Sequence, residues 1–383
     1  MVNEHVQSFC LATAICLVVF LLLRTWKRRH IYYCAAKIKG PLALPLIGSA
    51  YVLWGHTQQL LETLIRLSNK YGTLYKFWEG SDLSFFASKP EEVQIILTSC
   101  SEKYQAIKYL NPVFGKGLLT LPAPEWKIHR KLLRGTFSHE ILNSFVKTYV
   151  FYSNIMVEKL EETLGKGLID VFPLFSLCMT VILCDTMMGV QANTMKENGY
   201  NLILRTARLG ELGSLRTANL LLYPDILWNR TSMSKETHTI LEEVQQFIKK
   251  IVETKRLEKA KNVACASQKP ILLNRMLELE DTEEMWDEQM SLEETQTVLV
   301  AGADATTLTL GYVLMMLGMH QEIQTQVHQE LDFVFGVSNR DVTLEDLLQL
   351  QLLERVIKET LRIFPVAPLV GKYLTKDIVL GKF

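Results

Sequence analysis

The sequence predicts a mainly α protein with a small β-sheet region, an α+β fold class. From residue 90 onward, apolar residues recur every three or four positions between breaks rich in Pro and Gly, which is the spacing of amphipathic helices. Two short aromatic-rich runs, residues 73–78 and 83–87, flank the sequence Glu-Gly-Ser-Asp and predict a β-hairpin. Residues 298–319 are apolar apart from one charge, Asp304, and predict a helix buried on all sides.

The N-terminal region predicts a membrane anchor. Residues 9–23 are an uninterrupted apolar run, and basic residues follow it but do not precede it. A cleaved signal peptide has the opposite charge order and a small-residue cleavage site, so an anchor with a cytoplasmic body is the better interpretation. The alternative is a buried amphipathic helix. We expect residues 1–30 to form the anchor and basic stop, residues 31–50 a stiff proline-rich hinge, and residues 51–383 the globular domain.

The remaining elements follow in order. Residues 57–70 place four leucines on one face and predict a helix that ends at Tyr71-Gly72. Residues 233–261 predict a long amphipathic helix with dense charge, most simply a solvated surface helix. Residues 343–364 predict a helix stopped by Pro365, and residues 369–373 and 378–383 have the pattern of strand starts.

The central apolar run allows three interpretations. Ser291 and Glu294 have the spacing of a capping box that would begin the helix, and Gly302 is a weak helix residue where the backbone could open. A bilayer span fits the length, but Asp304 near the middle is costly in lipid and the flanks are long and charged. A core helix with a hydrogen-bonded aspartate, or one whose aspartate is catalytic, therefore fits better than a span.

Charge and cysteine content exclude some classes of function. The 41 basic and 41 acidic residues cancel, which predicts no nucleic-acid partner. The seven cysteines form no CxxC pair and lie near no histidine at zinc spacing. They are typical of reduced cysteines in a protein that faces the cytosol.

Three groups of polar residues stand out. Trp126 and Arg130 are four apart on a predicted helix, within what is by itself an ordinary basic face made by Lys127, His129, Arg130, Lys131 and Arg134. Glu359 and Arg362 are three apart and can pair on one helical face. Asp304 lies beside a cluster of threonines within the apolar run.

Together with the anchor, the hinge and the order of the elements, these motifs resemble the cytochrome P-450 superfamily of heme-thiolate monooxygenases, in particular its microsomal members. The resemblance covers essentially the whole chain. It implies the P-450 fold, heme b (iron) as cofactor, and residues 51–383 as a partial catalytic domain. Trp126 and Arg130 match the WxxxR motif that holds a heme propionate, and Lys372 stands where the family often has a second propionate-binding arginine.

The same resemblance assigns two further roles. Glu359 and Arg362 match ExxR, a buried ion pair behind the heme, so Glu359→Ala is expected to stop heme incorporation or folding. Residues 301–306 match the oxygen-activation motif, with Gly302 where the helix opens and Asp304 as the acid. The usual threonine is Ala305 here, and Thr306 lies about 100° further round the helix. A monooxygenase with this departure is expected to leak peroxide, and Ala305→Thr to lower that leak.

The family ligates iron through a cysteine in a glycine-rich loop near the C-terminus, and none of the seven cysteines has that context. We therefore expect no iron-ligating cysteine in this chain, and a truncated, inactive form whose residues 298–319 are partly exposed.

The family implies a small lipophilic substrate, contacted by residues 103–121 and 202–222, and electrons from an NADPH-cytochrome reductase. It also implies a single-pass endoplasmic reticulum membrane protein with its body in the cytoplasm. Two alternatives remain open: a non-catalytic, membrane-tethered helical scaffold, and a polytopic membrane protein that uses both apolar runs.

Overall fold

The computed structural model describes residues 19, 23, 25–44, 47–53, 60–190, 199–261, 271–336, 338 and 340–380. The chain divides into two compact units, Met1–Ser99 with Asp377–Phe383, and Cys100–Lys376. Most of the predicted anchor lies outside the described residues, as do Cys10, Cys16 and Cys265. The anchor and the division into residues 1–30, 31–50 and 51–383 stay predictions.

The first unit contains the β-hairpin and four helices of the described chain. Its elements are α2 (Arg29–Ala36), the 3₁₀ helix η1 (Ala50–Leu53), α3 (Leu60–Tyr71), β1 (Leu74–Glu79), β2 (Asp82–Ala87) and α4 (Pro90–Ser99). The hairpin is confirmed: β1 pairs antiparallel with β2 from Leu74↔Ala87 to Glu79↔Asp82. Gly80 in the two-residue turn has φ +62°, which favours glycine. The predicted helix at 57–70 is confirmed over α3.

The hairpin buries one face against α3. Tyr75 and Phe77 alternate inward along β1 and pack with Leu64 and Leu67 of α3. Part of the predicted hinge runs beside strand β1, because Gly48 forms an isolated antiparallel bridge with Glu79. A Cβ on Gly48 would lie 2.4 Å from the Trp78 carbonyl oxygen, so only glycine fits there.

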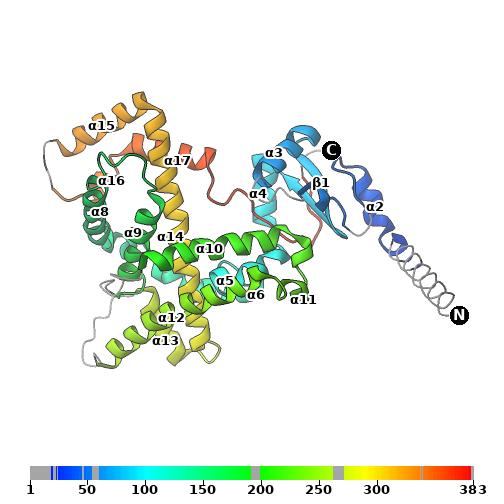
Figure 1. The fold of residues 1–383 in the computed structure, drawn as a ribbon, viewed down its shortest axis with the longest axis horizontal. Coiled ribbons are helices and arrows are strands. Elements are labelled where there is room, and N and C mark those ends of the chain that lie inside the picture. Colours follow the sequence, from blue (N-terminus) through cyan, green and yellow to red (C-terminus); the bar gives the residue numbers. More distant parts are fainter. Residues whose placement is uncertain are drawn as a thin grey trace. The chain divides into compact units, whose positions relative to one another are not determined.

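The regular elements of the second unit, within its described residues, are helices, and one isolated β-bridge joins Lys103 to Lys372. Its elements before the central helix are η3 (Gln105–Leu110), α5 (Asn111–Phe114), α6 (Ala123–Leu133), η4 (Arg134–Phe137), α7 (His139–Ser144), α8 (Val146–Glu161), α9 (Phe172–Thr186), α10 (Gly199–Ala218), η6 (Leu220–Leu222), α11 (Asp225–Trp228), α12 (Ser232–Lys261) and α13 (Leu272–Thr282). The central helix and its successors are α14 (Glu288–Met319), α15 (Gln321–Phe335), α16 (Leu344–Leu347) and α17 (Gln351–Ile363). Figure 1 shows α14 running through this unit, and helices α9 and α12 pack against it.

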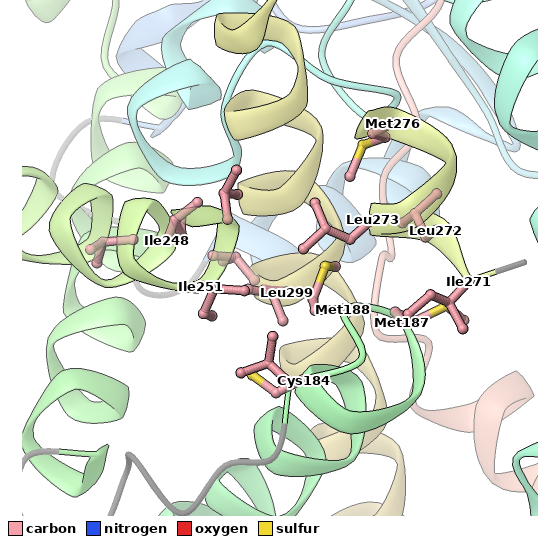
Figure 2. Close-up of a cluster of buried hydrophobic side chains, with 14 of the residues drawn as sticks. Cys184, Met187, Met188, Ile248, Ile251, Ile271, Leu272, Leu273, Met276 and Leu299 are labelled. Carbon is pink, nitrogen blue, oxygen red and sulfur yellow. The ribbon is translucent and has the colours of Figure 1, made fainter. Parts of the chain in front are cut away.

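The main hydrophobic core lies around the first half of α14. Leu299 of α14 meets Ile248 and Ile251 of α12, and Leu272 and Leu273 of α13 close the cluster (Figure 2). One face of α12 enters this core, as its predicted amphipathic pattern requires, and the rest of the helix is largely exposed. The apolar face is made by Ile240, Val244, Ile248, Ile251 and Val252. Its apolar residues recur at helical spacing, and burying them outweighs the charge density of the rest of the helix.

The central helix is confirmed, but its predicted start was wrong. The helix begins at Glu288 after the N-cap Asp287, whose carboxylate accepts from the Met290 N–H at 2.8 Å. Ser291 and Glu294 are fully buried inside the helix instead of capping it. Among the described residues, α14 is the helix long and apolar enough to cross a membrane, yet its packing against α9 and α12 favours the core-helix interpretation.

The second half of α14 is partly exposed, as predicted. Leu314, Met315 and Met319 have exposed fractions of 49%, 41% and 68%. The predicted strands near the C-terminal end of the sequence do not form among residues 340–380. Lys372 instead makes an isolated antiparallel bridge with Lys103.

The two predicted substrate segments, residues 103–121 and 202–222, pack against each other. The Arg216 guanidinium lies 4.7 Å from the centre of the Tyr109 ring and 4.8 Å from that of Trp228. The same group donates to the Leu222 carbonyl at 3.2 Å and pairs with Asp225. Arg216 thus joins η3 to the C-terminal end of α10 and to α11 through cation–π contacts.

Candidate functional site

Helix α6 presents the predicted tryptophan and arginine together. Pro122 precedes the helix and Pro124 lies in its first turn, where a missing N–H costs nothing. Trp126 is half-buried and Arg130 exposed, and the guanidinium lies 5.1 Å from the centre of the Trp126 ring. The i, i+4 spacing therefore places both on one side of α6, as the sequence predicted.

A second pair of cations is brought to the same place by backbone pairing. Lys103 and Lys372 are partners in an antiparallel bridge, flanked by hydrogen bonds from Tyr104 N to Gly371 O (3.1 Å) and from Tyr373 N to Glu102 O (3.0 Å). A Cβ on Gly371 would lie 2.5 Å from the Tyr104 Cβ, so this pairing requires a glycine. The Lys103 ammonium lies 6.0 Å from the Trp126 ring centre.

Lys103 belongs to this cationic site, whereas the sequence predicted it only as part of the substrate segment 103–121. Its ammonium donates to the Leu118 and Leu119 carbonyls at 2.9 and 2.8 Å. Burial and the charge of Lys372 lower the pKa of Lys103 to about 8, although the negative charge of Glu294 acts to raise it. No sequence motif marks this lysine, because the bridge to Lys372 comes from the far end of the unit.

The basic cluster, defined as Lys103, Arg130 and Lys372 around Trp126, fits an anion. Within the described residues, none of these three cations lies within 4.0 Å of a carboxylate oxygen. A guanidinium, two ammonium groups and an indole N–H can only donate hydrogen bonds, and of these groups the Lys103 ammonium already donates to two backbone carbonyls. They match the pair of carboxylates that a propionate-bearing cofactor would bring.

A buried acid lies directly behind this cluster and was missed as a site residue. Glu294 is 0% exposed; one of its carboxylate oxygens lies 2.6 Å from His129 Nδ1 and the other accepts from the Leu118 N–H at 3.0 Å. The sequence patterns gave His129 no role in a site and placed Glu294 in a capping box. Only the packing of α6 on α14 reveals the pair.

The predicted oxygen-activation residues lie further along α14, about 15 Å beyond Glu294 at 1.5 Å per residue. Asp304 is half-buried, and burial raises the pKa of its carboxyl. Ala305 is half-buried beside it. The structure therefore contains a carboxyl group that holds its proton more tightly than a surface aspartate does.

The threonines beside Asp304 differ in their surroundings. Thr306 is exposed and donates to the Gly302 carbonyl at 2.9 Å, whereas Thr307 is 1% exposed and its hydroxyl has no hydrogen-bond partner. The helix is continuous through Gly302, so the expected local opening is absent here. A Cβ at Gly302 would lie 3.0 Å from Leu183 Cδ1, so this glycine allows close packing of α9.

The Glu359–Arg362 pair forms, but its predicted burial was wrong. Two hydrogen bonds of 2.8 and 2.7 Å join the side chains, which are 56% and 69% exposed. The hydrogen bonds to Arg362 lower the pKa of Glu359. Burial of an ion pair depends on what packs over it, and no described element covers this face of α17.

An exposed pair predicts a small effect on stability. Glu359→Ala is expected to shift the melting temperature of this chain by no more than about 3 °C, because both side chains are already solvated in the folded chain. Thermal unfolding followed by circular dichroism tests this. A large drop would instead agree with the buried pair expected from the family motif.

Four cysteines lie among the described residues: Cys34, Cys100, Cys178 and Cys184. Burial raises the pKa of Cys178 to about 11 and that of Cys184 to about 12, which keeps both as thiols at neutral pH. No group of three or more metal-binding side chains occurs in the described part of the chain.

The fold and site define a mostly helical protein with a cationic site for a carboxylate-bearing group beside a long central helix. Comparison with known proteins gives the family: a model described as Cytochrome P450 matches residues 38–383. The chain belongs to the cytochrome P450 family of heme monooxygenases.

Several relatives align with this chain over most of their own length. The chain is 28% identical to cytochrome P450 4g1 of Drosophila melanogaster, over 95% of this chain and 72% of the relative. It is 30% identical to cytochrome P450 4V2 of Mus musculus, over 89% of this chain and 68% of the relative. Cytochrome P450 4c21 of Blattella germanica is 29% identical, over 91% and 72%.

Proposed function

We propose that this chain binds heme b through the basic cluster and belongs to a monooxygenase that inserts one oxygen atom from O2 into a small lipophilic substrate. The observation that carries the proposal is the basic cluster around Trp126. Arg130 and Lys103 lie near the Trp126 ring, and Lys372 pairs with Lys103 in the backbone bridge. Among the described residues, none of these three cations has a carboxylate partner. Family membership supports the cofactor, and the chemistry of these donors supports its orientation.

Each residue has a defined task in this proposal. Arg130 would fork onto one carboxylate of the heme, the Trp126 indole N–H would donate to the same group, and Lys103 and Lys372 would face the second. Heme, when bound, would supply the iron centre that activates dioxygen. Asp304 would hold a proton on its carboxyl, because burial raises its pKa, and would pass it on through the Thr306 hydroxyl or water.

The surroundings of the enzyme follow from the same proposal. Electrons would come from an NADPH-cytochrome reductase, and the body would face the cytoplasm from an endoplasmic reticulum membrane that residues 1–30 span once. The packed segments at Tyr109 and Arg216 would border the path of the lipophilic substrate.

A second candidate is a membrane-tethered scaffold without catalysis. The specific observation in its favour is that none of the seven cysteines has the glycine-rich context in which this family ligates iron.

The reduced, carbon-monoxide difference spectrum of the membrane-bound chain, with heme quantified beside it, tests both candidates. Bound heme with a thiolate-type long-wavelength band supports the monooxygenase. Heme that is bound without the band supports cofactor binding by a non-catalytic scaffold. Absence of heme contradicts the proposed site. Arg130→Met is expected to lower heme content severalfold, and Lys131→Met, an exposed neighbour on α6, is the control.

The pKa of Lys103 predicts a pH dependence. Because this pKa is lowered to about 8, Lys103 is protonated below pH 8 and neutral above it. Affinity for hemin is therefore expected to fall as the pH rises from 7 to 9, since an anion binds better to the protonated site. Absorbance titrations at both pH values measure this. The pH dependence over this range should be lost in Lys103→Met, and an identical slope in that variant would contradict the assignment.

A further inference from the structure

The crossing of α6 and α14 contains a buried polar contact that the cofactor site does not itself use. Glu294 is fully buried, and its carboxylate takes one hydrogen bond from the Leu118 N–H at 3.0 Å and faces His129 Nδ1 at 2.6 Å. Chain packing around it is tight. A Cβ on Gly117 would lie 2.6 Å from Glu294 Oε2. Such a carboxylate has no room to find other partners.

The imidazole is fixed from its other side as well. The His129 ring lies 4.6 Å from the ring of Trp286, centre to centre, and Trp286 Nε1 donates to Ser291 Oγ at 3.0 Å. His129 is therefore held between an indole from the segment before α14 and a carboxylate within α14. Both its position and its orientation follow from contacts with the central helix.

The orientation of His129 sets the rotation of α6. At 100° per residue, His129 points about 100° away from Arg130 around the helix, toward the buried side that it shares with Leu133. The Trp126 ring then lies between two cations, with the Arg130 guanidinium 5.1 Å and the Lys103 ammonium 6.0 Å from its centre. A rotation of α6 by about 30° would move side-chain tips at its rim by about 3 Å, which is as long as a hydrogen bond.

We propose that His129 and Glu294 form a positioning pair that fixes the rotation of α6 on α14 and thereby aims Trp126 and Arg130 at the carboxylates of the cofactor. The pair touches neither cofactor nor substrate. It rests on the proposed function, because it acts on the carboxylate site described there. Its effect should therefore be specific for ligands that carry free carboxylates.

The test compares two probes that differ only at those carboxylates. Hemin and hemin dimethyl ester are titrated separately into the full-length chain in detergent micelles, and the ratio of the two Kd values gives the carboxylate preference. The original chain is expected to prefer hemin by about tenfold or more, because the ester cannot form charge-assisted hydrogen bonds. Arg130→Met should remove most of that preference, and Lys131→Met should keep it.

His129→Leu is the decisive variant, and His129→Gln is its conservative rescue. His129→Leu should reduce the carboxylate preference severalfold while the Kd for the ester changes little. His129→Gln, whose amide N–H can still donate to Glu294, should retain most of the preference. A general loss of structure would weaken both probes alike, so the ratio separates positioning from folding.

Three outcomes would overturn the proposal. If Arg130→Met loses the preference but His129→Leu keeps it, the pair does not position α6, and the proposed cofactor site stands. If His129→Leu weakens both probes equally and His129→Gln does the same, the pair only stabilises the fold. If the original chain shows no preference for hemin over the ester, the proposed carboxylate site fails, and the positioning role with it.

Discussion

Replacing His129 with alanine is expected to lower the free energy of unfolding by about 3 kcal/mol, because it leaves the buried Glu294 carboxylate with one hydrogen bond and no imidazole. Uncompensated burial of a charge is more costly than loss of an entire buried pair. Urea unfolding of the detergent-solubilised chain, followed by far-ultraviolet circular dichroism, measures the change.

The double variant His129→Leu with Glu294→Leu is the matched comparison. It removes both polar groups and is expected to cost much less than His129→Ala alone. Lys131→Ala, on the same helix but exposed, should change the free energy of unfolding by less than about 0.5 kcal/mol. A double variant as unstable as the single one would show that the polar contact is not what stabilises this crossing.

Local patterns in the sequence were enough to predict local structure. The β-hairpin around Gly80 and the helix at α3 depend on neighbouring residues, and both are confirmed. Trp126 and Arg130 were likewise predicted to share one face, because i, i+4 spacing alone decides this.

Contacts between distant segments could not be predicted from the same patterns. Glu294 has the right spacing from Ser291 to form a capping box, and nothing nearby in the sequence indicates that His129 lies beside it. The pairing of Glu359 with Arg362 was predictable, but its exposure was not, since exposure depends on which elements cover α17. The place of Lys103 in the basic cluster was likewise not predictable, because the segment that pairs with it, around Lys372, is distant in the sequence.

The exposed half of α14 predicts a large effect on solubility. A variant chain that starts at residue 30 is expected to self-associate and to bind hydrophobic dyes strongly, because Leu314, Met315 and Met319 leave apolar surface in water. Replacing these three residues with glutamine, which favours helix, should lower dye fluorescence severalfold and increase the monomer fraction in analytical ultracentrifugation.

Phe333→Gln in the same shortened chain is the control. Phe333 is 87% exposed on α15, outside α14, so its replacement should change dye binding only slightly. A shortened chain that is monodisperse, melts cooperatively and binds little dye would contradict the prediction.

The bridge between Lys103 and Lys372 also has a consequence for the order of events during synthesis. Ribosomes add about 5–20 residues per second, so the two lysines leave the ribosome on the order of tens of seconds apart. For most of that interval α6 has already been synthesised, whereas Lys372 has not. A nascent chain can therefore offer only part of the basic cluster, and complete binding of a dicarboxylate must wait until almost the whole second unit has been translated.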